Sequence, residues 1–144
     1  MPPKPKDMDV DVIITQGPGG PTDVEFEMRP GGHRLEFKND NHPGVMVFFN
    51  IDDRARSGLL FQPKPADALW VAPPGQHCPT SASTWDGFVP LSVEQDSHGR
   101  NTSLIAYFRN LNVEQCRFAL RFLWPDGRME DYDPIGDGAN GLRR

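Results

Sequence analysis

The sequence predicts an all-β protein, a single-domain antiparallel β-sandwich of about seven to nine strands that is either immunoglobulin-like or cupredoxin-like. The clearest sign lies in residues 117–124, where large apolar side chains alternate with Arg and Ala before a Pro-Asp-Gly turn and a polar strand. The 14 glycines and 15 prolines supply many turns. No segment sustains the helical period long enough to support a helical architecture.

Short strands separated by Gly- and Pro-rich turns are expected along the chain. Residues 1–7 are interpreted as a flexible arm and residues 8–134 as the sandwich domain. Residues 45–51 (VMVFFNI) are apolar on both sides of the alternation, so we expect a central strand that is covered on both faces. Residues 135–144 follow Asp133-Pro134 and are interpreted as a Gly-rich tail. The other strands are expected at 10–14, 24–28, 33–38, 69–72, 88–93, 104–108 and 116–124.

Charge and terminal composition indicate location and partners. The formal net charge is −5, and no run of basic residues is longer than the pair Arg143-Arg144. We therefore expect neither nucleic acid nor an anionic membrane as a partner. The polar, Pro-rich start lacks the apolar core of a signal peptide, and no apolar run approaches the ~20 residues of a membrane span. We therefore expect a cytoplasmic protein whose cysteines, Cys78 and Cys116, are reduced.

The closing hairpin, with Asp133-Pro134 and the glycine-rich segment after it, resembles the ending of small uncharacterised bacterial β-sandwich proteins of the DP-EP type. In those proteins a Phe-x-Leu-x-Phe strand, a turn and a short strand end on Asp-Pro. Here residues 136–141 stand where Glu-Pro would follow. Residues 37–44, 68–71 and 78–93 are similar to bacterial hypothetical proteins. The resemblance implies a fold and no established activity.

Two parts of the sequence contain side chains of the kind that bind transition metals. Cys116 lies on a strand of the kind that supplies the thiolate of a blue-copper site, but no histidine follows it, since the last is His98. We therefore expect Cys116 to be a small buried core residue. His77 and Cys78 are weak candidates for zinc ligands, because no C-x-x-C or H-x-x-x-H spacing supports them.

Asp131, Asp133 and Asp137 are weak candidates for calcium ligands, because an acidic, Gly-rich segment offers hard oxygen ligands. Their spacing does not match the EF-hand loop. We expect the protein to hold no metal and no cofactor.

Catalytic sequence patterns are lacking. The sequence contains no G-x-S-x-G elbow, no phosphate-binding glycine loop and no pair of carboxylates that stands out from the acidic background. We expect a protein that is not an enzyme, and an enzyme whose site the sequence does not reveal is kept as an alternative.

A binding surface is the remaining expectation. Trp85 and Trp124 are candidate contact residues, with Trp124 half exposed at a hairpin tip, whereas Trp70 is expected in the core. Arg54 and Arg56 beside Leu59 and Leu60 form a second candidate group. We expect a module that binds a protein partner or associates with itself, and the alternative is a protein that binds a metal or a small ligand.

Overall fold

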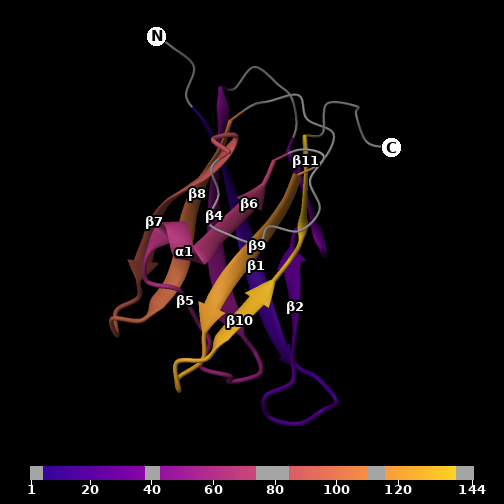
Figure 1. Cartoon of the computed structure of the whole chain (residues 1–144), viewed down its shortest axis with the longest axis vertical. Coiled ribbons are helices and arrows are strands. Elements are labelled where there is room, and N and C mark those ends of the chain that lie inside the picture. The colour runs from indigo at the N-terminus through magenta and orange to yellow at the C-terminus, as the bar shows by residue number, and fades with distance from the viewer. Residues whose placement is uncertain (1–4, 38–42, 74–84, 110–115, 139–144) are drawn as a thin grey trace.

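The computed structural model describes residues 5–37, 43–73, 85–109 and 116–138, and these form two β-sheets packed together (Figure 1). The first sheet has the strand order β2-β1-β4-β8-β7. Its strands are β1 (Lys6–Gln16), β2 (Val24–Arg29), β4 (Gly44–Asp53), β7 (Phe88–Gln95) and β8 (Asn101–Arg109). The all-β sandwich predicted from the sequence is confirmed.

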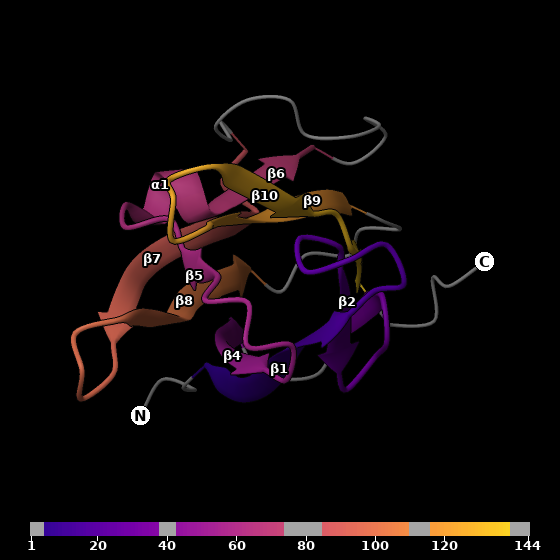
Figure 2. The same ribbon diagram turned by 90° about the horizontal axis from the view of Figure 1, so that it is seen from below.

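The second sheet is organised around β9 (Cys116–Leu123). β10 and β11 pair with one edge of β9 and β3 extends the sheet from β11, while β5 and β6 pair with the opposite edge and are joined by the short helix α1. Seen from below, the two sheets form separate layers (Figure 2). The bounds are β3 (Arg34–Phe37), β5 (Leu60–Phe61), α1 (Pro65–Ala68), β6 (Leu69–Ala72), β10 (Met129–Tyr132) and β11 (Ile135–Gly138).

Strand number and direction differ from the sequence prediction. The described part contains eleven strands, rather than the predicted number of about seven to nine, because short pieces such as the two-residue β5 also pair. Two pairs are parallel, β1 with β4 and β3 with β11, whereas a wholly antiparallel sandwich was expected. Alternation identifies a strand but not its direction, which depends on how the chain crosses between the sheets.

The Gly-rich segment after Asp133-Pro134 was expected to be a tail, yet its first four residues form β11. Pro134 lacks a backbone N–H and interrupts the ladder beside β9. Its carbonyl still accepts a hydrogen bond from the Phe118 N–H at 3.4 Å, and the chain then pairs with Cys116 and Arg117. The proline therefore divides one strand into two instead of ending the sheet.

The core between the sheets is built by the inward half of each alternation. Phe49, Phe88 and Phe118 come from β4, β7 and β9 and are fully buried. Their rings contact one another, with centroids 5.3 Å apart for Phe88 and Phe118 and 6.2 Å apart for Phe49 and Phe118. Burial of aromatic side chains of this size is the largest single source of stabilisation available to such a core.

Candidate functional site

Strand β4 carries apolar side chains on both of its faces. Val45, Val47 and Phe49 point into the core and are at most 3% exposed. Met46 and Phe48 point to the opposite side of the first sheet and are partly exposed. This two-sided pattern was the reason for expecting a covered central strand.

Neighbouring strands add further apolar side chains to that outer side. Ile105 of β8 lies opposite Phe48 and Tyr107 lies opposite Met46, while Val89 of β7 lies opposite Tyr107. Leu91, at the bulge of edge strand β7, is 49% exposed and continues the cluster to the edge of the sheet. We call this surface the first-sheet face, defined by Met46, Phe48, Val89, Leu91, Ile105 and Tyr107.

The expectation that β4 is covered on both faces is wrong for the part of the chain that the structure describes. β4 is central in its sheet, between β1 and β8. No described helix or strand lies over its outer side (Figure 2). The sequence showed correctly that both faces are apolar, but an apolar pattern does not say whether another element of the same chain covers it.

A row of carboxylates borders the first-sheet face. Asp7, Asp9 and Asp11 are exposed on β1, and the parallel register places Asp7 beside Met46 and Asp9 beside Phe48. All three project to the outer side, because the intervening β1 residues face the core. The apolar surface therefore has a negative border along its whole β1 side.

Polar contacts mark the two ends of the face. At one end the Ser103 hydroxyl donates to the Asn50 side-chain oxygen at 2.7 Å. At the other end Arg109 forms an ion pair with Asp86 at 2.9 Å. There the Tyr107 ring lies over Gly44, since a Cβ atom at Gly44 would overlap it. An apolar surface with a polar rim of this kind is typical of protein interaction sites.

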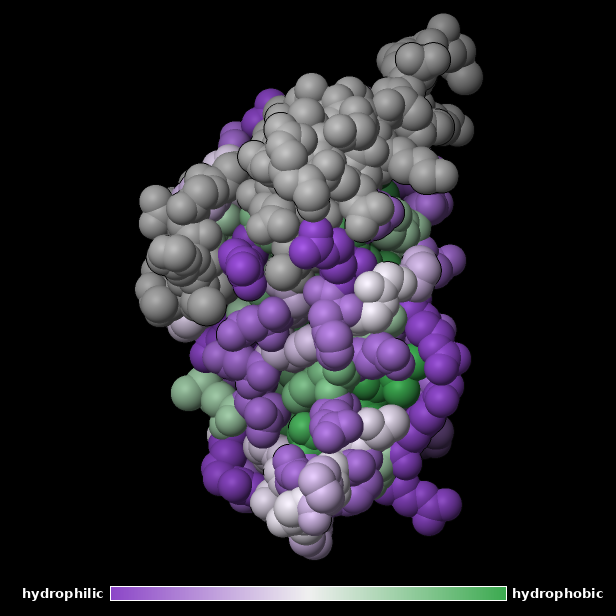
Figure 3. All heavy atoms as spheres, turned by 90° about the vertical axis from the view of Figure 1, so that its right-hand side faces the viewer, coloured by the Kyte–Doolittle hydropathy of each residue, from purple (hydrophilic) through white to green (hydrophobic). Residues whose placement is uncertain are grey.

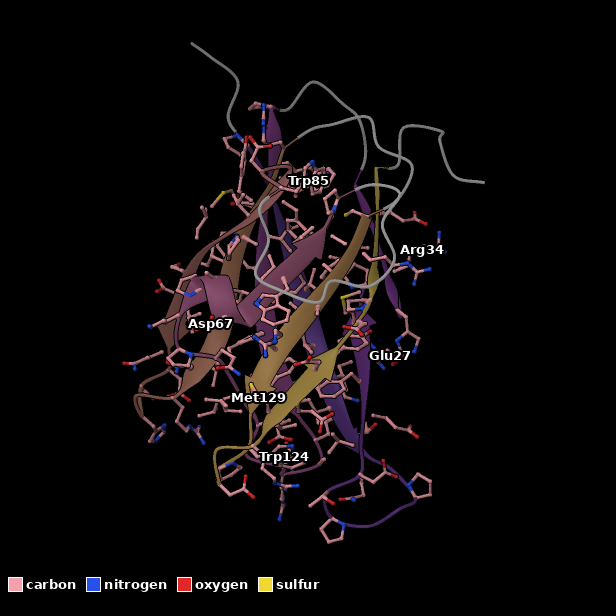
Figure 4. All side chains as sticks on the ribbon, in the orientation of Figure 1. Glu27, Arg34, Asp67, Trp85, Trp124 and Met129 are labelled. Atoms are coloured by element: carbon pink, nitrogen blue, oxygen red, sulfur yellow. The ribbon has the colours of Figure 1, made fainter. Side chains whose placement is uncertain are left out.

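The two tryptophans predicted as contact residues do not form one site. Trp85 and Trp124 lie at opposite ends of the molecule (Figure 4). Trp124 was expected to be half exposed, but it is 8% exposed, and its indole N–H donates to Glu130 at 3.1 Å. Trp124 continues the inward row of β9, and the Glu130 carboxylate satisfies its polar atom, so it can be buried.

Trp70, by contrast, was expected in the core and is only partly buried. It alternates with the buried Leu69 and Val71 and therefore points to the outer side of the second sheet. The Arg121 guanidinium lies 3.6 Å from its ring centroid, which is a cation–π contact.

The loop predicted as a contact segment is divided by the structure. Leu59 is 1% exposed and belongs to the core, so its prediction as a binding residue is wrong. Arg54 is paired with Asp52 at 3.0 Å. Arg56 and Leu60 line a cavity. The apolar spacing of this loop could not show which leucine turns inward, because the loop has no regular period.

The metal candidates are only partly within the described residues. His77 and Cys78 lie outside them. Asp131 forms an ion pair with Arg121 at 3.3 Å, and Asp133 lies close enough to Asp131 to feel its charge. The side chain of Asp137 is not among those described. In the described ranges no three His, Cys, Asp or Glu side chains come together as a metal-binding group. Cys116 is buried, as the sequence predicted.

The side of the molecule that carries β2 is mainly hydrophilic in its described part, with a short apolar strip (Figure 3). At the seam where β2 meets the second sheet, Phe26 stacks on Phe122 and Tyr132, with ring centroids 5.2 Å apart in both pairs. The Tyr132 hydroxyl donates to the Gly32 carbonyl at 3.2 Å. Burial, and secondly the charge of Glu27, raise the Tyr132 pKa, so the phenol stays protonated. These contacts close the sandwich on the β2 side.

No protein-family model and no curated protein matches this chain in sequence. The resemblance of the closing hairpin to DP-EP proteins therefore stays a prediction. In the described part of the chain, no helical segment has the length and hydrophobicity that a membrane-spanning helix requires.

The first-sheet face was missed by the sequence reasoning, although a signal was present. Residues 105 and 107 repeat the two-sided apolar pattern of residues 46 and 48 on another expected strand. Two adjacent strands with apolar residues on both faces indicate either a cover or an interface, and the sequence was interpreted only as the former.

Proposed function

We propose that this protein is a non-catalytic β-sandwich that binds a protein partner through the first-sheet face. The supporting observation is the outward cluster around Phe48 and Ile105, which leaves apolar side chains partly exposed on a sheet that no described element covers. Aromatic residues and Met are enriched in the buried centres of protein interfaces. A partner that covered this cluster would gain the free energy of removing its apolar area from water.

The charge around the face favours one class of partner. Asp7, Asp9 and Asp11 form its border, and the whole chain carries a net charge of −5. Complementary charge accelerates association and suppresses wrong partners. The expected partner therefore presents apolar side chains next to Lys or Arg. A second copy of this acidic chain fits the border less well.

The first test is capture from a lysate of the source organism with a matched set of variants. Phe48→Thr combined with Ile105→Thr removes the centre of the face with side chains that suit a strand. Met129→Thr is the control, because Met129 is 63% exposed on the second sheet. We expect captured proteins that the double variant loses and the control retains, quantified by mass spectrometry. Capture that is the same for all three proteins would contradict the proposal.

The second test addresses charge and self-association. Replacing Asp7, Asp9 and Asp11 together by Asn should slow association with the captured partner and reduce its dependence on salt. Light scattering on the purified chain measures its mass in solution. A dimer that Phe48→Thr abolishes would identify the partner as a second copy. An unchanged salt dependence in the Asn variant would reject a basic partner.

A further inference from the structure

A second feature, separate from the first-sheet face, is a cavity of about 620 Å³ where the loop after β4 meets the β7–β8 turn. Its lining includes the apolar side chains of Ile51, Leu59 and Leu60 together with Gly58. The polar and charged residues of the lining are Asp53, Arg56, Asp96, Arg100 and Thr102.

The loop after β4 is held in shape by Asp53. Its carboxylate accepts hydrogen bonds from the Ser57 N–H at 3.0 Å, the Ser57 hydroxyl at 2.9 Å and the Gly58 N–H at 2.9 Å. Arg56 within this loop has a φ of +52°, a conformation that is uncommon for residues other than glycine. Such backbone strain is retained where the surroundings impose it, and it is concentrated at functional sites.

The facing turn is held in shape by Asp96. Its carboxylate accepts from the His98 N–H at 2.8 Å and the Arg100 N–H at 3.0 Å, and it forms an ion pair with the Arg100 guanidinium at 2.9 Å. The Arg100 backbone N–H is the largest of the contributions that lower the Asp96 pKa. Asp96 and Arg100 therefore neutralise each other at the cavity.

The other two charged residues of the lining, Asp53 and Arg56, form no ion pair within the described residues. Arg100 is paired with Asp96, and the nearby Arg54 is paired with Asp52. Asp53 is engaged by the loop it holds. The Arg56 side chain makes no hydrogen bond or ion pair with any residue in the described ranges. Arg56 is exposed and lines the cavity, so its guanidinium donors are uncommitted there.

We propose that this cavity binds a carboxylate on a short apolar chain, namely a glutamate side chain of a peptide or protein, with Arg56 as its anchor. A guanidinium forms paired, charge-assisted hydrogen bonds with a planar carboxylate. Ile51 and Leu60 offer apolar contact to the methylene groups of glutamate. A phosphate dianion is less favoured than a carboxylate, because the unneutralised charge of Asp53 in the lining repels two negative charges about twice as strongly as one.

The test is an NMR titration of the intact chain with capped glutamate (N-acetyl-glutamate amide), and with capped glutamine as the uncharged isostere. We expect amide shifts at Ile51, Gly58, Leu60 and Thr102 with the glutamate probe and a Kd on the order of millimolar. The glutamine probe should leave these amides unshifted. Equal shifts with both probes, or a stronger response to inorganic phosphate, would overturn the proposal.

Variants assign the effect to Arg56. Arg56→Gln should weaken binding of the capped glutamate by about tenfold or more, and Arg56→Lys should restore part of it because it keeps the charge without the planar fork. Arg54→Gln is the matched control and should bind as the native chain does. The Phe48→Thr and Ile105→Thr double variant should also bind normally, since its face is separate. Unweakened binding by a folded Arg56→Gln would refute the assignment, as would loss with Arg54→Gln.

Discussion

Asp133, at the break between β10 and β11, is a carboxyl whose surroundings disfavour its ionised form. Partial burial and, secondly, the charge of Asp131 raise its pKa above the usual 3.8, and Arg117 opposes this only in part. A raised pKa in the folded state favours folding below pH 3.8, where the group is protonated in both states. That contribution is lost as the pH rises through the folded pKa, so ionised Asp133 costs stability at neutral pH.

Asp133→Asn should therefore raise the free energy of unfolding at pH 7 by up to about 1 kcal/mol, and leave it nearly unchanged at pH 3. Urea unfolding at the two pH values measures this. Asp126→Asn is the control of opposite sign, because hydrogen bonds from Arg128 lower the Asp126 pKa. That control should lose stability at pH 7. A loss at pH 7 for Asp133→Asn as well would show that its carboxylate is stabilising.

Single side chains also show where sequence reasoning stops. The burial of Cys116 was predicted correctly, because Cys116 falls on the same side of the alternation as the apolar Phe118. Trp124 was predicted to be half exposed because it lies at a hairpin tip, yet the acceptor that permits its burial, Glu130, lies across the turn. Whether a large amphipathic residue is buried depends on such a partner, and the partner becomes visible only with the register.

At the scale of elements, the conformation of the loop between β4 and β5 depends on the Asp53 carboxylate. Asp53→Ala would leave the N–H groups of Ser57 and Gly58 without their acceptor. We expect the free energy of unfolding to fall by about 1–2 kcal/mol. This is the lower part of the range for unsatisfied buried groups, because the loop is partly exposed. Amide exchange should become faster at Ser57 and Gly58 before it does so in the strands.

The neighbouring Asp52 provides the control for this loop. It forms an ion pair with Arg54 in which both side chains are about half exposed, at 42% and 50%. Asp52→Ala should cost less than about 0.5 kcal/mol, as exposed ion pairs do. Equal costs for the two substitutions would mean that Asp53 contributes charge alone and does not shape the loop.

The positions of strands with regular alternation were predictable from the sequence, but their pairing and direction were not. The strands around residues 10–14, 24–28 and 104–108 are found where the period of two placed them. The parallel pairing of β1 with β4 was not predicted, because β2 and β3 intervene in the chain and the crossing between sheets leaves no local pattern. The cavity at Arg56 was missed for the same reason, since its two walls are some 40 residues apart in sequence.

At the scale of the whole molecule, fold and proposed function depend on different faces of the same strands. The inward rows of β4, β7, β8 and β9 supply the core. The outward rows of β4, β7 and β8 supply the first-sheet face. A β-sheet with two apolar faces can use one for stability and leave the other for recognition, because successive side chains point in opposite directions.

Two adjacent phenylalanines test this division directly. Phe49 is 0% exposed and contacts Phe88 and Phe118, so Phe49→Ala should lower the free energy of unfolding by about 3–5 kcal/mol. Phe48, one residue away, is partly exposed, and Phe48→Ala should cost about 1 kcal/mol or less. Urea unfolding of both variants measures the difference. Similar costs would mean that Phe48 is covered in the native protein and that the first-sheet face is not available. If the costs differ as expected, stability does not account for a phenylalanine at position 48, which agrees with the proposed role of the first-sheet face in binding a partner.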